Sequence, residues 1–482
     1  MIKKQQELIT LRMKTYTPTI GIEVHAELKT KTKMFCDSKN DPHAGEPNAH
    51  VCPICMGHPG TLPVINKEAV RHVLKVGIAV GAELATYTEF DRKNYFYPDI
   101  PKGYQISQYL YPLVKGGELG GVALTRVHLE EDTARSLHDQ GEGSIIDYNR
   151  AGVPLMELVT EPVIHDAKTA GNFARELQLL LRTLGVSDAN MERGEMRIEA
   201  NISVSTTEKF GTKVEVKNIN SFKSVEGAIE YEIKRQIEAL EKGESIIQET
   251  RGWDESKGKT FSQRIKESAN DYRYFPDPDL PKLNVAHSEE LSVSRIKDTM
   301  PILPSEKRSK YSELGLTREQ IEIIISDIDT DCFYAKSIDS LESGNLVPKL
   351  VANYLISDLL PMIHNSEKII MECSHSNFRV LMQMIVDNKI TSRVAKDLLS
   401  EVVLEGKNPE TLASERGLLQ SNSDDVLKGI VSQIVDSYPE IVSEYKAGKE
   451  ASLQFLIGQG MKISKGSANP QMLAELIKKT IQ

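Results

Sequence analysis

Strict alternation of apolar and polar residues in several short segments is the feature that most constrains the fold of this chain. In residues 21–28, GIEVHAEL, the polar positions are Glu23, His25 and Glu27, and apolar residues lie between them. Successive side chains of a strand point to opposite faces of its sheet. The segment therefore predicts a strand with one apolar face and one face that carries carboxylates and an imidazole.

Segments 196–204 and 213–217 alternate in the same way, and segments 127–132 and 154–159 offer further polar residues. A half-exposed antiparallel sheet with a solvated face explains any one of them. As a set they favour a functional site, because Glu is a poor strand former and converging carboxylates repel unless a cation lies among them. Oxygen ligands and one imidazole suit Mg²⁺ or Mn²⁺ bridging nucleotide phosphates. The polar positions of these segments include His128, Glu130, Glu131, Asp132, Glu157, Arg197, Glu199, Glu215 and Lys217.

Residues 91–109 interleave cations and aromatic residues between prolines. Such a loop can bind an anion and stack a base, and a rigid loop packed by its own aromatic rings explains it equally well. No P-loop is expected, because residues 252–260 place five residues between their glycines where that motif has four. The polar and aromatic residues of interest in the loop are Arg92, Lys93, Tyr95, Tyr97 and Gln105.

The five cysteines make no disulfide framework, and their odd number favours a reducing compartment. Cys52 and Cys55 form a CxxC pair, with Cys36 upstream, which gives three of the four ligands of a structural zinc site. A histidine supplies the fourth, or the thiols are the reduced remnant of a former metal site. The histidines close to these cysteines in sequence are His43, His50 and His58.

The length of 482 residues predicts two to four domains. Strand and turn patterns dominate the first part, a proline-rich connector follows, and helical spacing begins near Thr317. We expect domains at 1–295, 296–412 and 413–482. The net charge of −10 confines any nucleic-acid contact to a local basic patch. No apolar run approaches the roughly 20 residues of a membrane span, so the chain is expected to be cytoplasmic and to make no membrane contact.

Several long runs resemble one family, in the same order and over nearly the whole chain. This family comprises the B subunits of glutamyl/aspartyl-tRNA amidotransferases. The matching runs are GIEVHAEL, VCPICMGHPGTLPVIN, FDRKNYFYPDIPKGYQISQ, VHLEEDTARS, DYNRAGVPLMELVTEP, FGTKVEVKNINSF, ETRGWDE, DYRYFPDPDLP and FLIGQGMKISKGSANP.

The resemblance implies an α+β fold with an antiparallel-sheet catalytic body of glutamine synthetase/guanido kinase type, then a helical domain and a YqeY-like tail that binds tRNA. It implies that ATP and Mg²⁺ activate the side-chain carboxylate of Glu-tRNA(Gln) or Asp-tRNA(Asn), and that ammonia then amidates it. The implied partners are the amidase (A) subunit and the small (C) subunit of the same complex. The tail lysines expected to contact tRNA are Lys462, Lys465, Lys478 and Lys479.

By the same resemblance, Mg²⁺ would be held by Glu23, His25, Glu130, Glu131, Glu157 and Glu215. Catalysis would rest on Glu130, Glu157 and Lys93. Nucleotide contacts are expected from Arg92, Tyr95, Tyr97, Gln105, Glu199 and Lys217. Zinc-binding members carry CxC and later CxxC, whereas Ser38 stands at the second position of the first pair here, which puts Zn²⁺ at Cys36, Cys52 and Cys55 in doubt.

Two rival hypotheses remain open at this stage. A stand-alone carboxylate–ammonia ligase would share the metal-rich sheet but would act on a free amino acid. A non-catalytic tRNA-binding scaffold would show no activity dependent on metal or ATP, and it gives no reason for glutamates in mid-strand.

Overall fold

The structure is a computed structural model that describes residues 15–137, 143–265, 272–339, 348–420, 424–464 and 468–481. The expected tRNA contact Lys465 lies outside these residues. The chain forms two compact units, one up to Leu303 and one from Pro304 onward. The division of the second unit near residue 412 stays a prediction.

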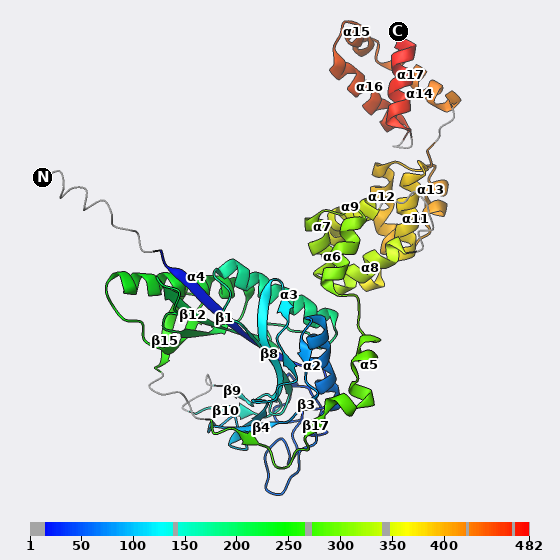
Figure 1. Cartoon of the computed structure of the whole chain (residues 1–482). Coiled ribbons are helices and arrows are strands. Elements are labelled where there is room, and N and C mark those ends of the chain that lie inside the picture. The colour runs from blue at the N-terminus through cyan, green and yellow to red at the C-terminus, as the bar shows by residue number, and fades with distance from the viewer. Residues whose placement is uncertain are drawn as a thin grey trace, which may run out of the picture. The chain divides into compact units, whose positions relative to one another are not determined.

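The first unit is built on a sheet of ten strands (Figure 1). Its strands are β1 (Thr17–Glu27), β2 (Glu83–Leu84), β6 (Val114–Lys115), β7 (Glu118–Leu119), β8 (Val122–Glu131), β11 (Pro154–Thr160), β12 (Met196–Ser205), β13 (Val214–Ile219), β14 (Glu249–Asp254) and β15 (Lys259–Ile265). Their order is β15-β14-β13-β12-β1-β11-β8-β6-β2, with β7 beside β8. All pairs are antiparallel except β13 with β14.

Smaller strand pairs complete this unit. They are β3 (Tyr87–Thr88) with β17 (Leu283–Asn284), β9 (Arg135–Leu137) with β10 (Ile145–Asp147), and β4 (Asp91–Asn94) with β5 (Tyr104–Ser107) and β16 (Phe275–Pro276). The loop of interleaved cations and aromatics is therefore a hairpin. Residues 252–260 lie in the β14–β15 hairpin, not in the strand–loop–helix of a P-loop.

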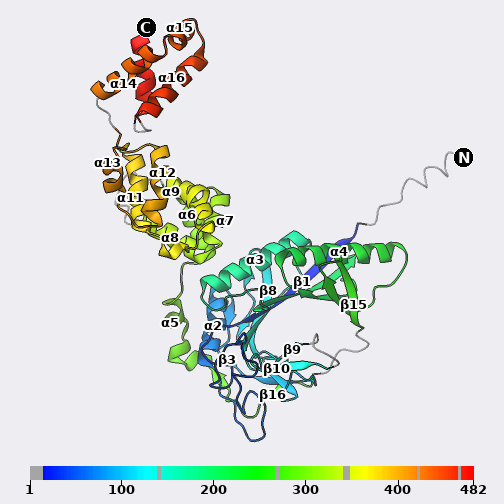
Figure 2. The same ribbon diagram turned by 180° about the vertical axis from the view of Figure 1, so that it is seen from behind.

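Two long helices, α3 (Ala167–Thr183) and α4 (Phe222–Glu241), cover one face of the sheet, and the opposite face turns toward β9 and β10 (Figures 1 and 2). Each begins at a capping side chain: Asp166 accepts from Thr169 N, and Ser221 accepts from Ser224 N. The remaining helical segments of the unit are α2 (Lys67–Ala79), η1 (Val285–His287), η2 (Glu289–Leu291) and α5 (Val293–Lys297).

The apolar face of β1 fixes the orientation of its polar face. Ile20, Ile22, Val24 and Ala26 are at most 1% exposed and belong to the central core of the unit. Full burial of such a side chain is worth about 1.5–3 kcal/mol, and a one-residue slip in register would turn the whole row outward. Core burial therefore holds Glu23 and the polar residues that follow it on the opposite side.

The second unit is helical in its described residues. Its helices are α6 (Pro304–Glu313), α7 (Arg318–Ile325), α8 (Ile328–Ile338), α9 (Pro348–Tyr354), η3 (Leu355–Leu359), α10 (Leu360–His364), η4 (Ile370–Glu372), α11 (His375–Val386), α12 (Ser392–Val403), α13 (Pro409–Glu415), α14 (Asp424–Ser437), α15 (Pro439–Lys446), α16 (Glu450–Ile463) and α17 (Pro470–Ile481). The last four share a core of their own that includes Leu427, Ile434, Leu456, Leu473 and Ile477.

A mixed α/β body with a large sheet, followed by a helical region, confirms the architecture predicted from sequence at that level. The finer likeness to glutamine synthetase and guanido kinases stays a prediction. Among the residues described, no helix combines the length and apolar character that crossing a membrane requires.

Candidate active site

Acidic and imidazole side chains from three neighbouring strands meet on the polar face of the sheet. In the strand register His25 of β1 lies opposite Glu157 of β11, and Glu157 lies opposite His128 of β8. Glu23 and Glu130 lie two residues from these histidines on the same faces of β1 and β8. Glu130, His128 and Glu157 are 1%, 3% and 6% exposed, so a solvated strand face does not explain them.

Glu157 is the centre of this group, which we call the acidic cluster (Glu23, His25, His128, Glu130 and Glu157). Its Oε2 lies 3.4 Å from His25 Nε2 and 3.3 Å from His128 Nε2. Two groups of residues each bring three ligand atoms within 4.8 Å of one another. The first group is Glu23, His25 and Glu157, and the second is His128, Glu130 and Glu157. The geometry thus offers two adjacent cation sites that share one carboxylate.

The charges of the acidic cluster are strongly coupled. Burial, and then the charge of Glu157, raise the pKa of Glu23 to about 7. Burial alone would lower the pKa of His25, but the hydrogen bond and charge of Glu157, followed by Glu130, raise it to about 9. Burial would raise the pKa of Glu157, yet the charge of His128 and the hydrogen bonds from both histidines hold it well below its usual range. Carboxylates held this close together are stabilised by a positive charge among them.

The donor set fits a hard divalent cation. Oε2 of Glu130 is buried and has no hydrogen-bond partner in the described part of the chain, which is costly unless another group binds it. Carboxylate oxygens with imidazole nitrogens suit Mg²⁺ or Mn²⁺, and a pair of adjacent sites is the arrangement that stabilises attacking and leaving oxygens in phosphoryl transfer.

Two of the six metal ligands expected from the resemblance lie outside this cluster. Neighbouring residues of a strand face opposite ways, so Glu131 turns away from Glu130. It forms an ion pair with Lys102 and accepts from Ile106 N at 2.9 Å. Glu215 on β13 accepts from Thr250 Oγ1 at 2.6 Å.

A second charged group adjoins Glu23 on its other side. Lys217 Nζ lies 2.8 Å from Glu199 Oε2 and 3.8 Å from Glu215 Oε1. Glu199 lies directly opposite Glu23 in the β1–β12 register, and both Glu199 and Lys217 influence the pKa of Glu23. These three residues thus border the acidic cluster and do not add a ligand to its two triads.

The hairpin β4–β5 presents a lysine and aromatic rings to the acidic cluster. Burial alone would lower the pKa of Lys93, but the charge of Glu130 and the smaller contributions of Tyr274, Tyr95 and Glu157 together raise the pKa above its usual value. Its ammonium lies 5.2 Å from the ring centre of Tyr272 and 5.8 Å from that of Tyr95. Lys93 therefore stays charged beside the carboxylates.

The other residues expected to contact nucleotide have partners within the protein. Arg92 pairs with Asp277 at 2.7 Å and lies over the Tyr104 ring. Tyr95 donates to Gln105 Oε1 at 2.8 Å, and Gln105 donates to the Glu131 carbonyl at 2.7 Å. Tyr97 is 54% exposed.

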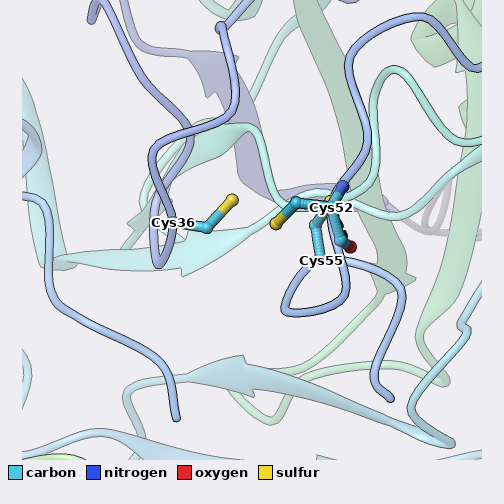
Figure 3. A group of neighbouring side chains, drawn as sticks. All are labelled: Cys36, Cys52 and Cys55. Atoms are coloured by element: carbon cyan, nitrogen blue, oxygen red, sulfur yellow. Dashed lines mark hydrogen bonds between the residues drawn. The ribbon is translucent and has the colours of Figure 1, made fainter. Parts of the chain in front are cut away.

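The three N-terminal cysteines lie together, with their ligand atoms within 4.8 Å (Figure 3). A buried lysine accompanies them: Lys33 Nζ is 3.9 Å from Cys55 Sγ and donates to the Tyr148 carbonyl at 3.1 Å. A hydrogen bond from Cys36, and then the charge of Lys33, outweigh burial and lower the pKa of Cys55 to about 5. The lysine thus supplies the positive charge that a metal would otherwise bring to these thiols.

The candidates for a fourth zinc ligand do not join the cysteines. His43 Nε2 lies 3.5 Å from Glu195 and His50 Nε2 lies 3.7 Å from Asp41. His58 is exposed and lies outside the group of ligand atoms. Three thiols beside a buried ammonium fit a tetrahedral zinc site poorly.

Sequence reasoning selected the strand face but left some of its residues unassigned. His128 alternates with Glu130 on β8, and this spacing was its only signal. Arg126, two residues earlier, lies 3.6 Å from Glu157. Arg197 donates to Asp132 at 2.9 Å and lies opposite His25. Their proximity to Glu157 and His25 arises from pairing between distant strands.

Comparison with known proteins decides the family. Residues 18–290 match the family model described as "GatB/GatE catalytic domain", and residues 333–481 match the one described as "GatB domain". The chain belongs to the family of aspartyl/glutamyl-tRNA(Asn/Gln) amidotransferase B subunits. It is 42% identical over 483 residues to the family member of Persephonella marina, covering 97% of this chain and 100% of that protein. The members from Thermodesulfovibrio yellowstonii and Thermus thermophilus are each 43% identical, over 97% and 96% of this chain and 99% and 98% of their own lengths. Membership confirms the predicted enzyme class, a carbon–nitrogen ligase of the amidotransferase type.

Proposed function

We propose that this chain is the ATP-dependent component that converts Glu-tRNA(Gln) or Asp-tRNA(Asn) to Gln-tRNA(Gln) or Asn-tRNA(Asn), with ammonia from a partner amidase. The observation that carries the proposal is the acidic cluster: buried carboxylates of three strands converge where oxygen ligands would bind divalent cations. The relatives are named as B subunits of aspartyl/glutamyl-tRNA(Asn/Gln) amidotransferases, and these names support the choice of substrate.

The chemistry begins with a poor electrophile. A carboxylate repels nucleophiles, and oxide leaves badly, so the side-chain carboxylate of the aminoacyl group must be activated. One of its oxygens attacks the γ-phosphorus of ATP, the bond to the β–γ bridging oxygen breaks, and ADP leaves. Ammonia then adds to the acyl carbon, phosphate departs with the bonding electron pair, and the nitrogen loses one proton.

The residues of the chain have three tasks in this reaction. Glu23, His25, His128, Glu130 and Glu157 would hold Mg²⁺, which supplies charge neutralisation and alignment of the phosphates when bound. Lys93, charged and next to Glu130, offsets negative charge that develops on the transferred phosphoryl group. The buried walls around Glu130 exclude water, which would otherwise hydrolyse the activated acyl group.

The helical tail provides the remaining support. Lys462 of α16 and Lys478 and Lys479 of α17 are exposed and carry positive charge on a chain that is acidic as a whole. They suit contacts with tRNA phosphates. Neither a free-amino-acid ligase nor a metal-independent scaffold would need both this tail and the acidic cluster.

The test uses the complex reconstituted with its amidase and small partner proteins, ATP, Mg²⁺ and misacylated tRNA. Replacing Glu130 or Glu157 with Ala should abolish ATP-dependent amidation and leave the glutaminase activity of the amidase. Glu83→Ala is the matched control, because Glu83 is an exposed glutamate of β2 in the same sheet. Full amidation by the Glu130 or Glu157 variants would refute the assignment, and equal use of free glutamate would favour the stand-alone ligase.

A further inference from the structure

A second polar pocket lies beside the acidic cluster and has no task in the reaction as described. It has a volume of about 250 Å³. Glu27 reaches it from β1, the strand that also carries Glu23 and His25. The pocket is lined by Glu27, Pro42, His43, Arg135, Arg150, Met191, Glu192, Arg193, Gly194 and Asn220.

Glu27 is a buried carboxylate that lacks a direct partner. It is 8% exposed, and within the described part of the chain its carboxylate makes no hydrogen bond or ion pair. It follows His25 by two residues on the same face of β1, so the two side chains leave the strand roughly 7 Å apart. Arg197 lies opposite His25 in the β1–β12 register and pairs with Asp132 at 2.9 Å. A cationic group that entered the pocket would offset the cost of burying the Glu27 carboxylate.

The rim of the pocket carries two arginines, Arg135 and Arg193, with Glu192 beside them. Burial lowers the pKa of His43, and the charges of Arg193 and Arg135 lower it further, which places both guanidinium groups near this imidazole. Arg193 is 56% exposed, with its Nε 3.3 Å from Glu195 Oε1, and Arg135 is exposed. Arg150 instead donates to the Thr133 and Ala134 carbonyls and shapes the wall.

The protein therefore presents three zones in a fixed order: the acidic cluster, then the carboxylate of Glu27, then Arg135 and Arg193. The acidic cluster suits divalent cations, which in turn would bind a substrate carboxylate and phosphates. The end of a misacylated tRNA has charges in the matching order. Its side-chain carboxylate is followed by the α-ammonium, about 5 Å away in a glutamyl group, and then by the phosphate of the last nucleotide.

We infer that this pocket binds the aminoacyl end of the tRNA, with Glu27 binding the α-ammonium and Arg135 and Arg193 contacting the terminal phosphate. The inference rests on the proposed function and adds a recognition site for it. The acidic cluster can hold the divalent cations that a triphosphate needs, whereas Glu27 belongs to neither ligand triad, so ATP is assigned to the cluster and the aminoacyl end to the pocket. Glu27 is then a specificity residue that holds the substrate so that its side chain reaches the cations.

The decisive probe is 2-hydroxyglutaryl-tRNA, in which a hydroxyl replaces the α-ammonium without adding bulk. With the wild-type complex, kcat/KM for this substrate should fall at least tenfold below that for Glu-tRNA, as expected for the loss of a charged hydrogen bond. In Glu27→Gln the two substrates should differ by less than about threefold, whereas the surface control Glu83→Gln should keep the wild-type ratio. Equal use of both substrates by the wild type, or an unchanged ratio in Glu27→Gln, overturns the inference. Failure of the proposed function would look different, because neither substrate would then be amidated with ATP.

A second variant tests the rim. Arg193→Gln should raise the KM for Glu-tRNA and reduce the slope of log KM against log salt by about one, as expected when one phosphate contact is lost. Arg175→Gln is the control, since Arg175 is similarly exposed on α3, on the other face of the sheet, and pairs with Glu226. Equal salt slopes in the two variants would overturn the phosphate contact.

Discussion

A fully buried carboxylate, Glu232, connects helix α4 to strands β14 and β15, and its removal gives a sharp test of the fold. Glu232 is 0% exposed. It accepts two hydrogen bonds from Arg235, at 2.6 and 2.9 Å, one from Thr260 at 3.0 Å and one from Gln236 at 2.9 Å. Arg251 Nε lies 3.5 Å away.

Substituting Ala for Glu232 removes the hydrogen bonds of Arg235 to this carboxylate and leaves that arginine 4.0 Å from Glu249, the carboxylate that Arg251 also contacts. Breaking a buried ion pair on one side typically costs about 3–5 kcal/mol, and we expect a loss of that size in the free energy of unfolding. With a urea m-value of about 3 kcal/mol/M, the unfolding midpoint should fall by about 1–1.7 M. The matched control is Glu238→Ala on the same helix, where an exposed pair with Lys234 should contribute within about 0.5 kcal/mol.

Trp253 provides the assay. It is the only tryptophan of the chain and lies on β14, with its ring centre 6.3 Å from that of Tyr231 on α4. Its fluorescence during urea titration therefore follows this helix–strand contact. A shift for Glu232→Ala no larger than that for Glu238→Ala would refute the reasoning.

Three further predictions concern the tail and the thiols. Gly460→Val should destabilise the tail by about 1–3 kcal/mol, because even a Cβ there would lie 2.3 Å from Leu473 Cδ2, and an unchanged thermal melt of its helices would contradict this. Deleting residues from about Ser421 should weaken tRNA binding and flatten its salt dependence in filter binding, and unchanged affinity would count against the tail contact. At micromolar zinc, elemental analysis should find well below one zinc ion per chain, because Lys33 lies beside the thiols. If the wild-type protein instead holds one zinc ion per chain and Cys36→Ser holds none, the cysteines do bind metal.

The local pattern of the site could be predicted from sequence, but its assembly could not. Alternation identified the polar face that carries His25, because a period of two follows from strand geometry alone, whereas Glu130 and Glu157 were noted as acidic residues of segments 127–132 and 154–159. That His25 lies opposite Glu157 depends on pairing between strands some 130 residues apart, which no local pattern specifies. Alternation also separates Glu130 from Glu131, and the structure shows Glu131 paired with Lys102 away from the cluster.

Two other features depended on three-dimensional packing. Helical spacing was predicted from Thr317 onward, but residues 348–364 are divided among α9, η3 and α10, and Pro361 cannot donate the backbone hydrogen bond of a regular helix. The alternating pattern placed Glu27 on the polar face of its strand. Its burial and its position in a pocket could be known only from the three-dimensional structure.

The proposed function requires that carboxylates from separate strands converge on divalent ions. The simplest test of this is to count the Mn²⁺ ions that the protein binds. By electron paramagnetic resonance and calorimetry, the wild-type protein should bind two Mn²⁺ ions per chain at the acidic cluster, close enough to couple magnetically. Glu23→Gln should keep one of them, and Glu157→Gln should lose both, because both ligand triads share Glu157. A Glu157→Gln protein that binds as many ions as the wild type would contradict the account.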